Sequence, residues 1–425
     1  MVEQIVDLHI HSKYSRACSK HLSFESIATA CEIRGIDMVV TGDMTHPAWF
    51  ASMRDKLKED TEGVYKLKDG TSVTKFVIGT ELSSIKKHKG KTRRVHLCVF
   101  APNLEVAEKF NKVLDTRGFN LKSDGRPILG LPCKDILELM LGVDRNMVMV
   151  PAHAWTPWFG IFGSKGGYDS LEDCFEDLTP YIRAIETGLS SDPLMNWRLS
   201  ALDNITLISN SDAHSTQKLG REANVLEFAS EADVTYNELF RIINEEDKKK
   251  FKYTIEFYPE EGKYHCDGHR DCNVVMEPEE TKKNKGICPK CRRKLTIGVL
   301  NRVFELADRS IDQAKEAGRH KIPYRSLVPL PEILADTFGC GVSTKRVNSA
   351  YDLMIDKLGS EFNILMNSSV SDIESATDKY VADAIDRVRN GHVVVRPGYD
   401  GEFGVVKVFD EGKESRYGKQ LDINF

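Results

Sequence analysis

The sequence predicts an α/β fold of the β/α-barrel type, in which strand ends converge on one metal-binding rim. Seven apolar, strand-like runs carry a histidine, aspartate or glutamate at or near their ends, and amphipathic helical patterns separate most of them. In a β/α barrel the carboxyl ends of the strands meet at one rim, where active sites lie. One shared polynuclear metal site explains these endings better than seven coincidences.

The first run leads into Asp7-Leu-His9-Ile-His11-Ser12. Alternate residues of a strand face the same way, so His9 and His11 can chelate one metal ion. Alone, such a pair is more often an ordinary histidine pair, and the prediction therefore depends on the later runs. These are residues 36–41, 74–80, 94–100, 147–152, 182–185 and 205–211, associated in that order with Asp43, Glu81, His96, His153, Glu186 and Asp212.

Helical patterns occupy much of the sequence between the runs. Ser23 is placed to cap a helix over residues 24–34, and Gly35 would end it. Residues 54–73 are charged and predict another helical segment, which turns back at Asp69-Gly70. Further helices are expected at residues 106–114, 135–141, 234–243, 302–309, 332–338, 347–358, 362–365 and 373–389, with a hairpin at 393–408.

Composition gives no global case for nucleic-acid binding, because the net charge of the 425 residues is -5. Any basic surface must be local. No run is apolar enough to cross a bilayer, and the first strand begins almost at Met1, so we expect neither a leader nor a membrane partner. Most of the ten cysteines lie singly in helix or strand patterns. We therefore expect an intracellular, cytoplasmic and reducing location.

The clustered cysteines have the spacing of a zinc ribbon. Cys288-Pro-Lys-Cys291 pairs with His269-Arg-Asp-Cys272 across a polar, basic spacer, which predicts four ligands for a structural zinc. Cys266 and His265 compete for the fourth position. The module also carries a local positive patch, made of Lys282, Lys283, Lys285, Lys290, Arg292, Arg293 and Lys294.

The loop after His153 mixes aromatic residues with glycines, and it includes Trp155, Trp158, Phe159 and Lys165. Stacking on an unpaired base is one physical use of such a loop. A small hydrophobic core over the barrel rim explains it equally well.

Basic residues give further candidate substrate contacts. The loop Lys86–Arg94 lies between two predicted strands, and it is either a solvated turn or a phosphate-contacting loop. Arg126 lies in an irregular polar loop and Arg221 follows the last metal-ligand position. Both are predicted to contact substrate.

The set His9-x-His11, Glu81, His96, His153 and Asp212-x-His214 resembles the PHP superfamily of metal-dependent phosphoesterases, which implies a distorted seven-stranded β/α barrel. Longer motifs resemble the endonuclease Q family over nearly the whole chain. They are Asp7-Leu-His-Ile-His-Ser, Gly42-Asp-Met-Thr-His-Pro, Ser123-Asp-Gly-Arg-Pro-Ile-Leu-Gly-Leu, the zinc ribbon and Tyr324-Arg-Ser-Leu-Val-Pro-Leu-Pro. Members of that family nick DNA on the 5′ side of uracil, hypoxanthine, xanthine and abasic sites.

The resemblance also implies a ligand set for the barrel. One divalent metal would be held by His9, His11, Glu81 and Asp212, and a second by Glu81, His96 and His153, with Glu81 bridging. Zinc, manganese, magnesium and iron stay open. His214 is either a ligand or the proton donor to the leaving 3′ oxygen, and Glu186 is a ligand or a support for one.

The chain departs from the wider PHP pattern at two positions. Arg16 stands where many members carry an acid, and Met44 stands where they carry a histidine. Most ligands of a third metal are thus absent, although Cys18, Asp43 or His46 could replace them. Arg16 could instead clamp the scissile phosphate.

We therefore expect a lesion-specific endonuclease of DNA repair with a catalytic barrel (residues 1–245), a zinc ribbon (246–298) and a mainly helical C-terminal domain (299–425), near the nucleoid. The alternatives are a small-molecule phosphatase on the same barrel and a non-catalytic DNA-damage-binding protein. The ribbon argues against the first, and the near-complete ligand set argues against the second. The final Gln420–Phe425 faintly resembles a sliding-clamp peptide.

Overall fold

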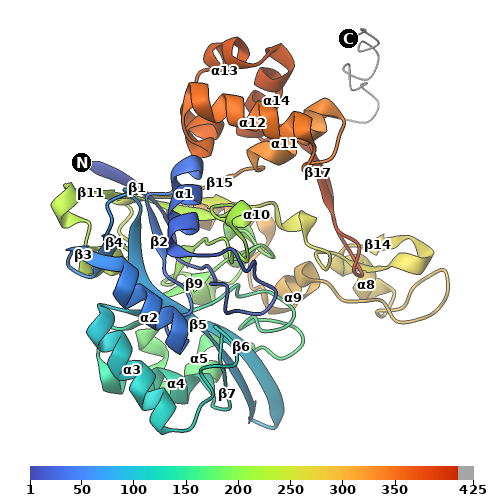
Figure 1. Ribbon diagram of the computed structural model, residues 1–425. Coiled ribbons are helices and arrows are strands. Elements are labelled where there is room, and N and C mark those ends of the chain that lie inside the picture. The colour runs from blue at the N-terminus through green and yellow to red at the C-terminus, as the bar shows by residue number, and fades with distance from the viewer. Residues whose placement is uncertain (410–425) are drawn as a thin grey trace.

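The computed structural model describes residues 1–409, and its centre is a mixed sheet of eleven strands (Figure 1). The strands are β1 (Val2–Asp7), β2 (Met38–Val40), β3 (Leu57–Thr61), β4 (Val64–Leu67), β5 (Lys75–His88), β6 (Lys91–Ala101), β7 (Ile128–Leu129), β8 (Val148–Pro151), β11 (Ala223–Phe228), β12 (Phe251–Glu256) and β15 (Tyr324–Ser326). Their order is β15-β12-β11-β1-β2-β5-β4-β3, with β6 and β7 paired to β5 and β8 paired to β6. The predicted mixed α/β fold is confirmed.

A separate pair of parallel strands is formed by β9 (Ala184–Glu186) and β10 (Thr206–Ile208). Strand β9 ends at Glu186, and Asp212 follows β10. Backbone hydrogen bonds tie its ends to the main sheet. The amide of Ala154, after β8, donates to the Glu186 carbonyl at 2.9 Å, and the amide of His11, after β1, donates to the Ala213 carbonyl at 3.0 Å. Within residues 1–409 the strand ladders do not close into a ring, so the barrel remains a prediction.

The helices of this first part are α1 (Phe24–Arg34), α2 (Pro47–Lys56), α3 (Leu104–Thr116), α4 (Cys133–Val143), α5 (Leu171–Phe175), α6 (Pro193–Asn196) and α7 (Tyr236–Asn244). The predicted ends of the first helix are confirmed. The Ser23 side chain accepts from the Ser26 amide, and Gly35 takes the left-handed conformation at φ +84°.

The helical segment predicted at residues 54–73 is wrong. Helix α2 ends at Lys56, and the chain continues as a hairpin of β3 and β4 that turns at Gly63 with φ +71°. Strand β3 lies at the edge of the sheet and exposes three charged residues, 58–60. Charged residues are common on an edge strand because they discourage pairing with another chain. Here they made the strand look like an exposed helix in the sequence.

The main sheet extends beyond the predicted domain boundary at residue 245. Strand β12 pairs antiparallel with β11, and β15 pairs parallel with β12. The ribbon region contains the antiparallel strands β13 (Asp267–His269) and β14 (Val274–Met276) and helix α8 (Pro278–Lys283). The division of the chain at residues 245 and 298 therefore stays a prediction.

The C-terminal part is mainly helical, as predicted, and its helices within residues 330–389 lie together at one end of the molecule (Figure 1). Its elements are α9 (Val299–Leu306), α10 (Ile311–Gly318), α11 (Leu330–Phe338), α12 (Lys345–Leu358), a π-helical turn (Asn363–Asn367), α13 (Val370–Ala376), α14 (Lys379–Arg389) and the hairpin strands β16 (Val394–Arg396) and β17 (Val405–Lys407). The single helix predicted at residues 373–389 is broken at Asp378, whose side chain caps α14. The clamp-like peptide Gln420–Phe425 lies outside the described residues.

A buried ion pair joins the C-terminal helices to the sheet domain. Glu361 is 3% exposed, and its carboxylate accepts hydrogen bonds from Arg34 Nη1 and from the Tyr351 hydroxyl, each at 2.9 Å. Arg34 ends α1, so the contact connects the two parts of the molecule. No helix within residues 1–409 is long and apolar enough to cross a membrane.

Candidate active site

Three polar residues that follow strands of the predicted rim take a strained backbone conformation. Asp43 follows β2, His153 follows β8 and Asp212 follows β10, and their φ angles are +46°, +29° and +47°. Non-glycine residues rarely adopt positive φ, and such strain collects at functional sites. The strained turns therefore mark the ends of β2, β8 and β10 as the candidate site.

The first group of metal-ligand atoms comes from His9, His11 and Asp212, whose donor atoms lie within 4.8 Å of one another. His11 Nε2 is 3.0 Å from Asp212 Oδ1, and His9 Nε2 is 3.6 Å from the same oxygen. The structure thus brings together the histidine pair from the start of the chain and an aspartate two hundred residues later.

The second group comes from Glu81, His96 and His153, which are all buried. Glu81 Oε1 is 2.7 Å from His96 Nδ1 and 3.2 Å from His153 Nε2. The same carboxylate also faces the first group, since Oε1 is 3.6 Å from His9 Nε2 and Oε2 is 3.4 Å from His11 Nε2. Glu81 therefore lies where a bridging ligand would be needed.

The donor atoms fit metal ions. Nε2 of His9 is a buried nitrogen with no hydrogen-bond partner in the described part of the chain. A buried polar atom without a partner is destabilising, and a metal ion would remove that penalty for His9. Imidazole nitrogens combined with carboxylates suit zinc, manganese or iron.

Two buried carboxylates orient the first histidines from behind. His9 Nδ1 donates to Glu186 Oε2 at 2.9 Å, and His11 Nδ1 lies 3.3 Å from Asp43 Oδ1. Such bonds hold the opposite ring nitrogen, Nε2, toward the metal position. Asp43 also accepts from the Ser12 amide and hydroxyl at 2.8 and 2.6 Å, so it fixes the loop rather than completing a third metal site.

The pKa values describe a site that attracts cations. Burial lowers the pKa of His11, but its bonds with Asp212 and Asp43 outweigh burial and raise that pKa to about 9. Burial would raise the pKa of Glu81, yet His96, His9 and Arg126 hold it well below its usual value. Buried carboxylates thus stay charged and favour positive charge on their neighbours, and metal ions would displace those protons.

Arg126, and not Arg16, contacts the metal-ligand group. Arg126 Nη1 is 3.0 Å from Glu81 Oε2, and its side chain is 22% exposed. Arg16 is 82% exposed and pairs with Asp124 at 3.4 Å. A Cβ atom on Gly125 would lie 2.1 Å from Asp43 Oδ2, so this close approach requires glycine. The Ser123–Pro127 motif therefore places one arginine beside Glu81.

His214 lies at the mouth of the site. Its ring centroid is 4.6 Å from that of His11, its Nδ1 donates to the Asp212 carbonyl at 2.8 Å, and its side chain is 31% exposed. Neither Cys18 nor His46 joins a group of three metal donors within residues 1–409. Burial raises the pKa of the Cys18 thiol to about 12, and His46 stacks on Tyr14 at 4.2 Å. The structure assembles no third metal site from them.

The aromatic loop divides into a buried part and an exposed part. Trp155 is 1% exposed and its indole N–H donates to Asn196 at 2.8 Å, so its predicted role in base stacking is wrong. Phe159 stacks on His96 at 4.2 Å, whereas Trp158 is 42% exposed and Lys165 is exposed. Trp155 is buried because other parts of the chain pack over it, and the residues next to it in the sequence do not indicate this.

Arg221 has a structural contact that the sequence did not indicate. Its Nε donates to the Ser211 carbonyl at 2.9 Å, so it fixes the turn before Asp212. Asp7 supports the same turn, because its carboxylate accepts from the Ser211 amide at 3.1 Å and hydroxyl at 2.6 Å. In the sequence, only the position of Asp7 at the start of the motif Asp7–Ser12 indicated a supporting role for its carboxylate.

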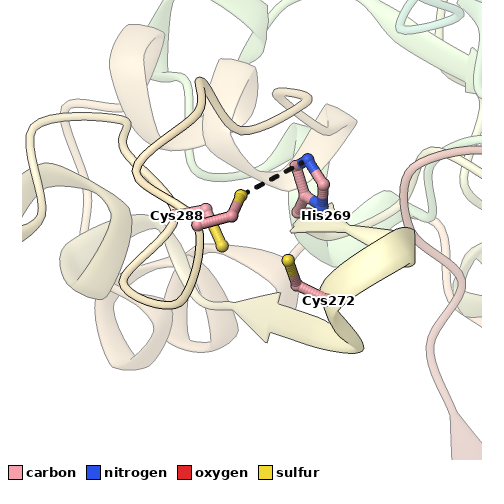
Figure 2. A group of neighbouring side chains, drawn as sticks. His269, Cys272 and Cys288 are labelled. Atoms are coloured by element: carbon pink, nitrogen blue, oxygen red, sulfur yellow. Dashed lines mark hydrogen bonds between the residues drawn. The ribbon is translucent and has the colours of Figure 1, made fainter.

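The ribbon cluster contains His269, Cys272, Cys288 and Cys291, whose donor atoms lie within 4.8 Å of one another. Figure 2 shows His269, Cys272 and Cys288 pointing toward a common centre. His269 Nε2 is 3.8 Å from Cys291 Sγ. Cys266 is buried outside this group, so the structure favours His269 as the fourth donor.

The basic side chains of the ribbon face solvent. Their exposure leaves them available to phosphates, and within residues 1–409 none of them forms an ion pair with a carboxylate. The exposed residues are Lys282, Lys283, Lys285, Lys290, Arg292, Arg293 and Lys294.

The structure matches that of the lesion-specific endonuclease PfuEndoQ from Pyrococcus furiosus, with a TM-score of 0.84, 31% sequence identity and 96% coverage of each chain. The chain belongs to the endonuclease Q family. A second endonuclease Q structure, in complex with a 27-mer duplex that has an abasic lesion at the active site, matches with a TM-score of 0.82 and 31% identity, over 96% of this chain and 98% of that one.

Two curated relatives and one family model also match the chain. Uncharacterized protein MJ0043 of Methanocaldococcus jannaschii is 32% identical over 276 residues, which are 64% of this chain and 33% of that protein. The chain thus spans about a third of that relative. Uncharacterized protein YqxK of Bacillus subtilis is 27% identical over 94% of this chain and 98% of its own. The MJ0043 C-terminal domain model matches residues 329–392.

Glu81→Gln tests the bridging position. The substitution keeps the volume but removes the charge between the two donor groups, so we expect loss of bound barrel metal and of DNA nicking, with DNA binding retained. Elemental analysis and a nicking assay measure this, with the exposed Glu374→Gln as the control. Normal nicking by Glu81→Gln in metal-replete buffer contradicts the dinuclear arrangement.

Cys288→Ser tests the ribbon. Loss of one thiolate should unfold the ribbon locally, weaken DNA binding and flatten its salt dependence, since each neutralised phosphate adds roughly 0.9 to the salt slope. The barrel should keep its metals. Zinc content and DNA affinity at several salt concentrations measure the effect. Cys266→Ser is the matched control. If DNA affinity and its salt dependence are unchanged in Cys288→Ser, the ribbon does not bind DNA and only connects the other parts of the structure.

Proposed function

We propose that this chain is a lesion-specific DNA-repair endonuclease, which hydrolyses the phosphodiester 5′ to uracil, hypoxanthine, xanthine or an abasic site. The position of Glu81 between two histidine-containing donor groups carries the proposal, because it suits two metal ions acting on one phosphate. The likeness to PfuEndoQ and to the complex with abasic duplex supports the choice of substrate.

Two divalent cations, when bound, would neutralise the phosphodiester and lower the pKa of a water molecule that attacks it. His9, His11 and Asp212 would hold one, His96 and His153 the other, and Glu81 both. Histidine nitrogen favours zinc, manganese or iron over magnesium, which prefers oxygen ligands. The ribbon's thiolates and imidazole suit a structural zinc.

The chain's own residues supply the remaining functions. Arg126 is a fixed positive charge beside Glu81 Oε2, and its planar guanidinium suits a phosphate oxygen. His214 lies at the exposed edge, where its protonated ring would give a proton to the leaving 3′ oxygen, against a burial that lowers its pKa. Glu186 and Asp43 hold His9 and His11 in place.

The surface around the site suits a long polyanion better than a small ester. The exposed ribbon lysines and arginines would contact phosphates outside the reacting centre, and the tip of the β5–β6 hairpin adds the exposed Lys86, Lys87 and Lys91. A small-molecule phosphatase needs neither feature. A DNA-repair substrate supports the expected intracellular location near the nucleoid.

A nicking assay on labelled duplexes tests this function. Substrates that contain uracil, hypoxanthine or an abasic site should be cut on the 5′ side when divalent metal is added, and the undamaged duplex should stay intact. Hydrolysis of phosphomonoesters alone would instead support the phosphatase. Binding of damaged DNA without turnover in any metal would support the damage-binding protein.

Arg126→Ala should reduce kcat more than it weakens DNA binding, because the guanidinium lies at the reacting centre. A hydrogen bond to a charged group is worth about 1.5–3 kcal/mol, so we expect a loss of about 10- to 150-fold, with partial recovery in Arg126→Lys. Single-turnover kinetics measure the effect. Arg16→Ala is the matched control, and a larger loss there would assign the phosphate contact to Arg16.

A further inference from the structure

Three aromatic side chains from separate segments form a row at the edge of the site: Trp158, Tyr264 and Phe403. The ring centroids of Trp158 and Tyr264 are 5.5 Å apart at an angle of 68°. The ammonium of Lys263 lies 5.8 Å from the Tyr264 centroid and 5.5 Å from that of Phe403. We call these four residues the aromatic row.

One end of the aromatic row is joined through the chain to the metal-ligand group. Trp158 precedes Phe159, whose ring stacks on His96 at 4.2 Å and whose carbonyl accepts from the His96 amide at 2.8 Å. Trp158 is therefore the chain neighbour of Phe159, whose ring contacts the predicted metal ligand His96. A strand whose phosphate reaches Glu81 would pass this end of the row.

The far end of the row rests on a rigid turn between β16 and β17. The amides of Gly398, Gly401 and Gly404 donate to the carbonyls of residues 260, 263 and 261 at 2.8, 2.9 and 3.1 Å. A Cβ atom on Gly404 would lie 2.0 Å from the Glu260 carbonyl oxygen, so glycine is required for this contact. These bonds hold Phe403 and Lys263 side by side.

The ribbon supports the same turn from its other side. The Asp400 carboxylate accepts from the Arg270 amide at 2.8 Å, and the Tyr399 hydroxyl donates to Asn273 at 2.8 Å. Figure 1 shows strand β17 extending from the ribbon, near β14, toward the helical domain. The aromatic row is therefore built from the loop after β8, the segment before β13 and the turn between β16 and β17.

The composition of the row indicates its ligand. Phe403 is 73% exposed and Trp158 is 42% exposed, although both are held in place. Within residues 1–409 no carboxylate forms an ion pair with Lys263. Exposed aromatic rings interleaved with a free cation suit a nucleobase that has left the double helix, together with its phosphate, because every base has a π face.

We propose that the aromatic row binds unpaired nucleobases of the strand that adjoins the cleaved phosphate, with Lys263 on the backbone. The inference rests on the proposed function for the identity of the strand as DNA. Paired bases are stacked on each other and offer no face to the row, so fully paired duplex is not its ligand.

Binding of undamaged DNA by the full-length protein tests the row without cleavage. The probe is a single-stranded oligonucleotide that contains 2-aminopurine, whose fluorescence falls on stacking. Stacking is worth about 1–3 kcal/mol per base, so Phe403→Ala should weaken single-strand binding about 5- to 150-fold and restore fluorescence. Affinity for fully paired duplex should not change.

Conservative and neighbouring variants make the result specific. Phe403→Tyr should retain binding, and Val405→Ala, which removes an exposed apolar side chain from the same hairpin, should behave as the parent. Lys263→Ala should lower the salt dependence of single-strand binding, whereas Lys263→Arg should keep it. Circular dichroism and zinc content verify that each variant is folded.

The outcomes separate this inference from the proposed function. If the parent nicks lesion DNA but Phe403→Ala binds single strands as the parent does, the aromatic row is not a nucleobase site and the nuclease assignment stands. If the parent nicks nothing while Phe403→Ala loses single-strand binding, the row is supported and the nuclease assignment fails. Equal losses on paired duplex and single strand would overturn the inference.

Discussion

The structure depends on one buried carboxylate, that of Glu81. It lies within β5, has almost no solvent contact, and faces the imidazoles of His9, His11, His96 and His153 and the guanidinium of Arg126; each of its two oxygens faces positive or protonatable groups. An isolated buried charge would be strongly destabilising, so these contacts, or the metal ions that would join them, must compensate it. Every other feature of the site follows from that requirement. The strained turns at His153 and Asp212, the supporting carboxylates and the close approach of Gly125 all serve to bring donors around one point.

Local chemistry explains what could be predicted from the sequence. The histidine pair, Glu81, His96, His153 and Asp212 all follow or lie in short apolar runs, so strand periodicity and residue type predict that they lie close together, and the resemblance to the PHP superfamily predicts the two groups in which the structure has them. The ribbon followed from ligand spacing alone. The hairpin of β3 and β4 was missed because an exposed edge strand is as charged as a surface helix. Trp155 was misassigned because an aromatic residue in a loop gives no local sign of whether tertiary packing will cover it.

The choice between Arg16 and Arg126 shows where sequence reasoning ends. Arg16 is close in sequence to the histidine pair, so it was the natural candidate to replace a missing metal ligand. The loop around Gly125 instead brings Arg126 to Glu81, over a separation of 45 residues. The aromatic row is further from prediction, because Trp158, Tyr264 and Phe403 belong to three segments with no common pattern. Backbone hydrogen bonds join the segments that carry Tyr264 and Phe403, and the ring contact between Trp158 and Tyr264 adds the third segment.

The ribbon has a very small hydrophobic core, and its contact with the C-terminal hairpin adds to its stability. Its own hydrophobic core consists of Val274, Met276, Cys288 and Leu295, with Cys272 packed against them. So small a core cannot offset the conformational entropy of the module, and such modules usually depend on a metal for their fold. The bonds from Asp400 and Tyr399 give it a second support. Because the same turn carries Phe403 and adjoins Lys263, the metal that folds the ribbon would also hold the aromatic row at a fixed distance from the catalytic rim. The ribbon would in this way influence which part of a bound strand reaches Glu81.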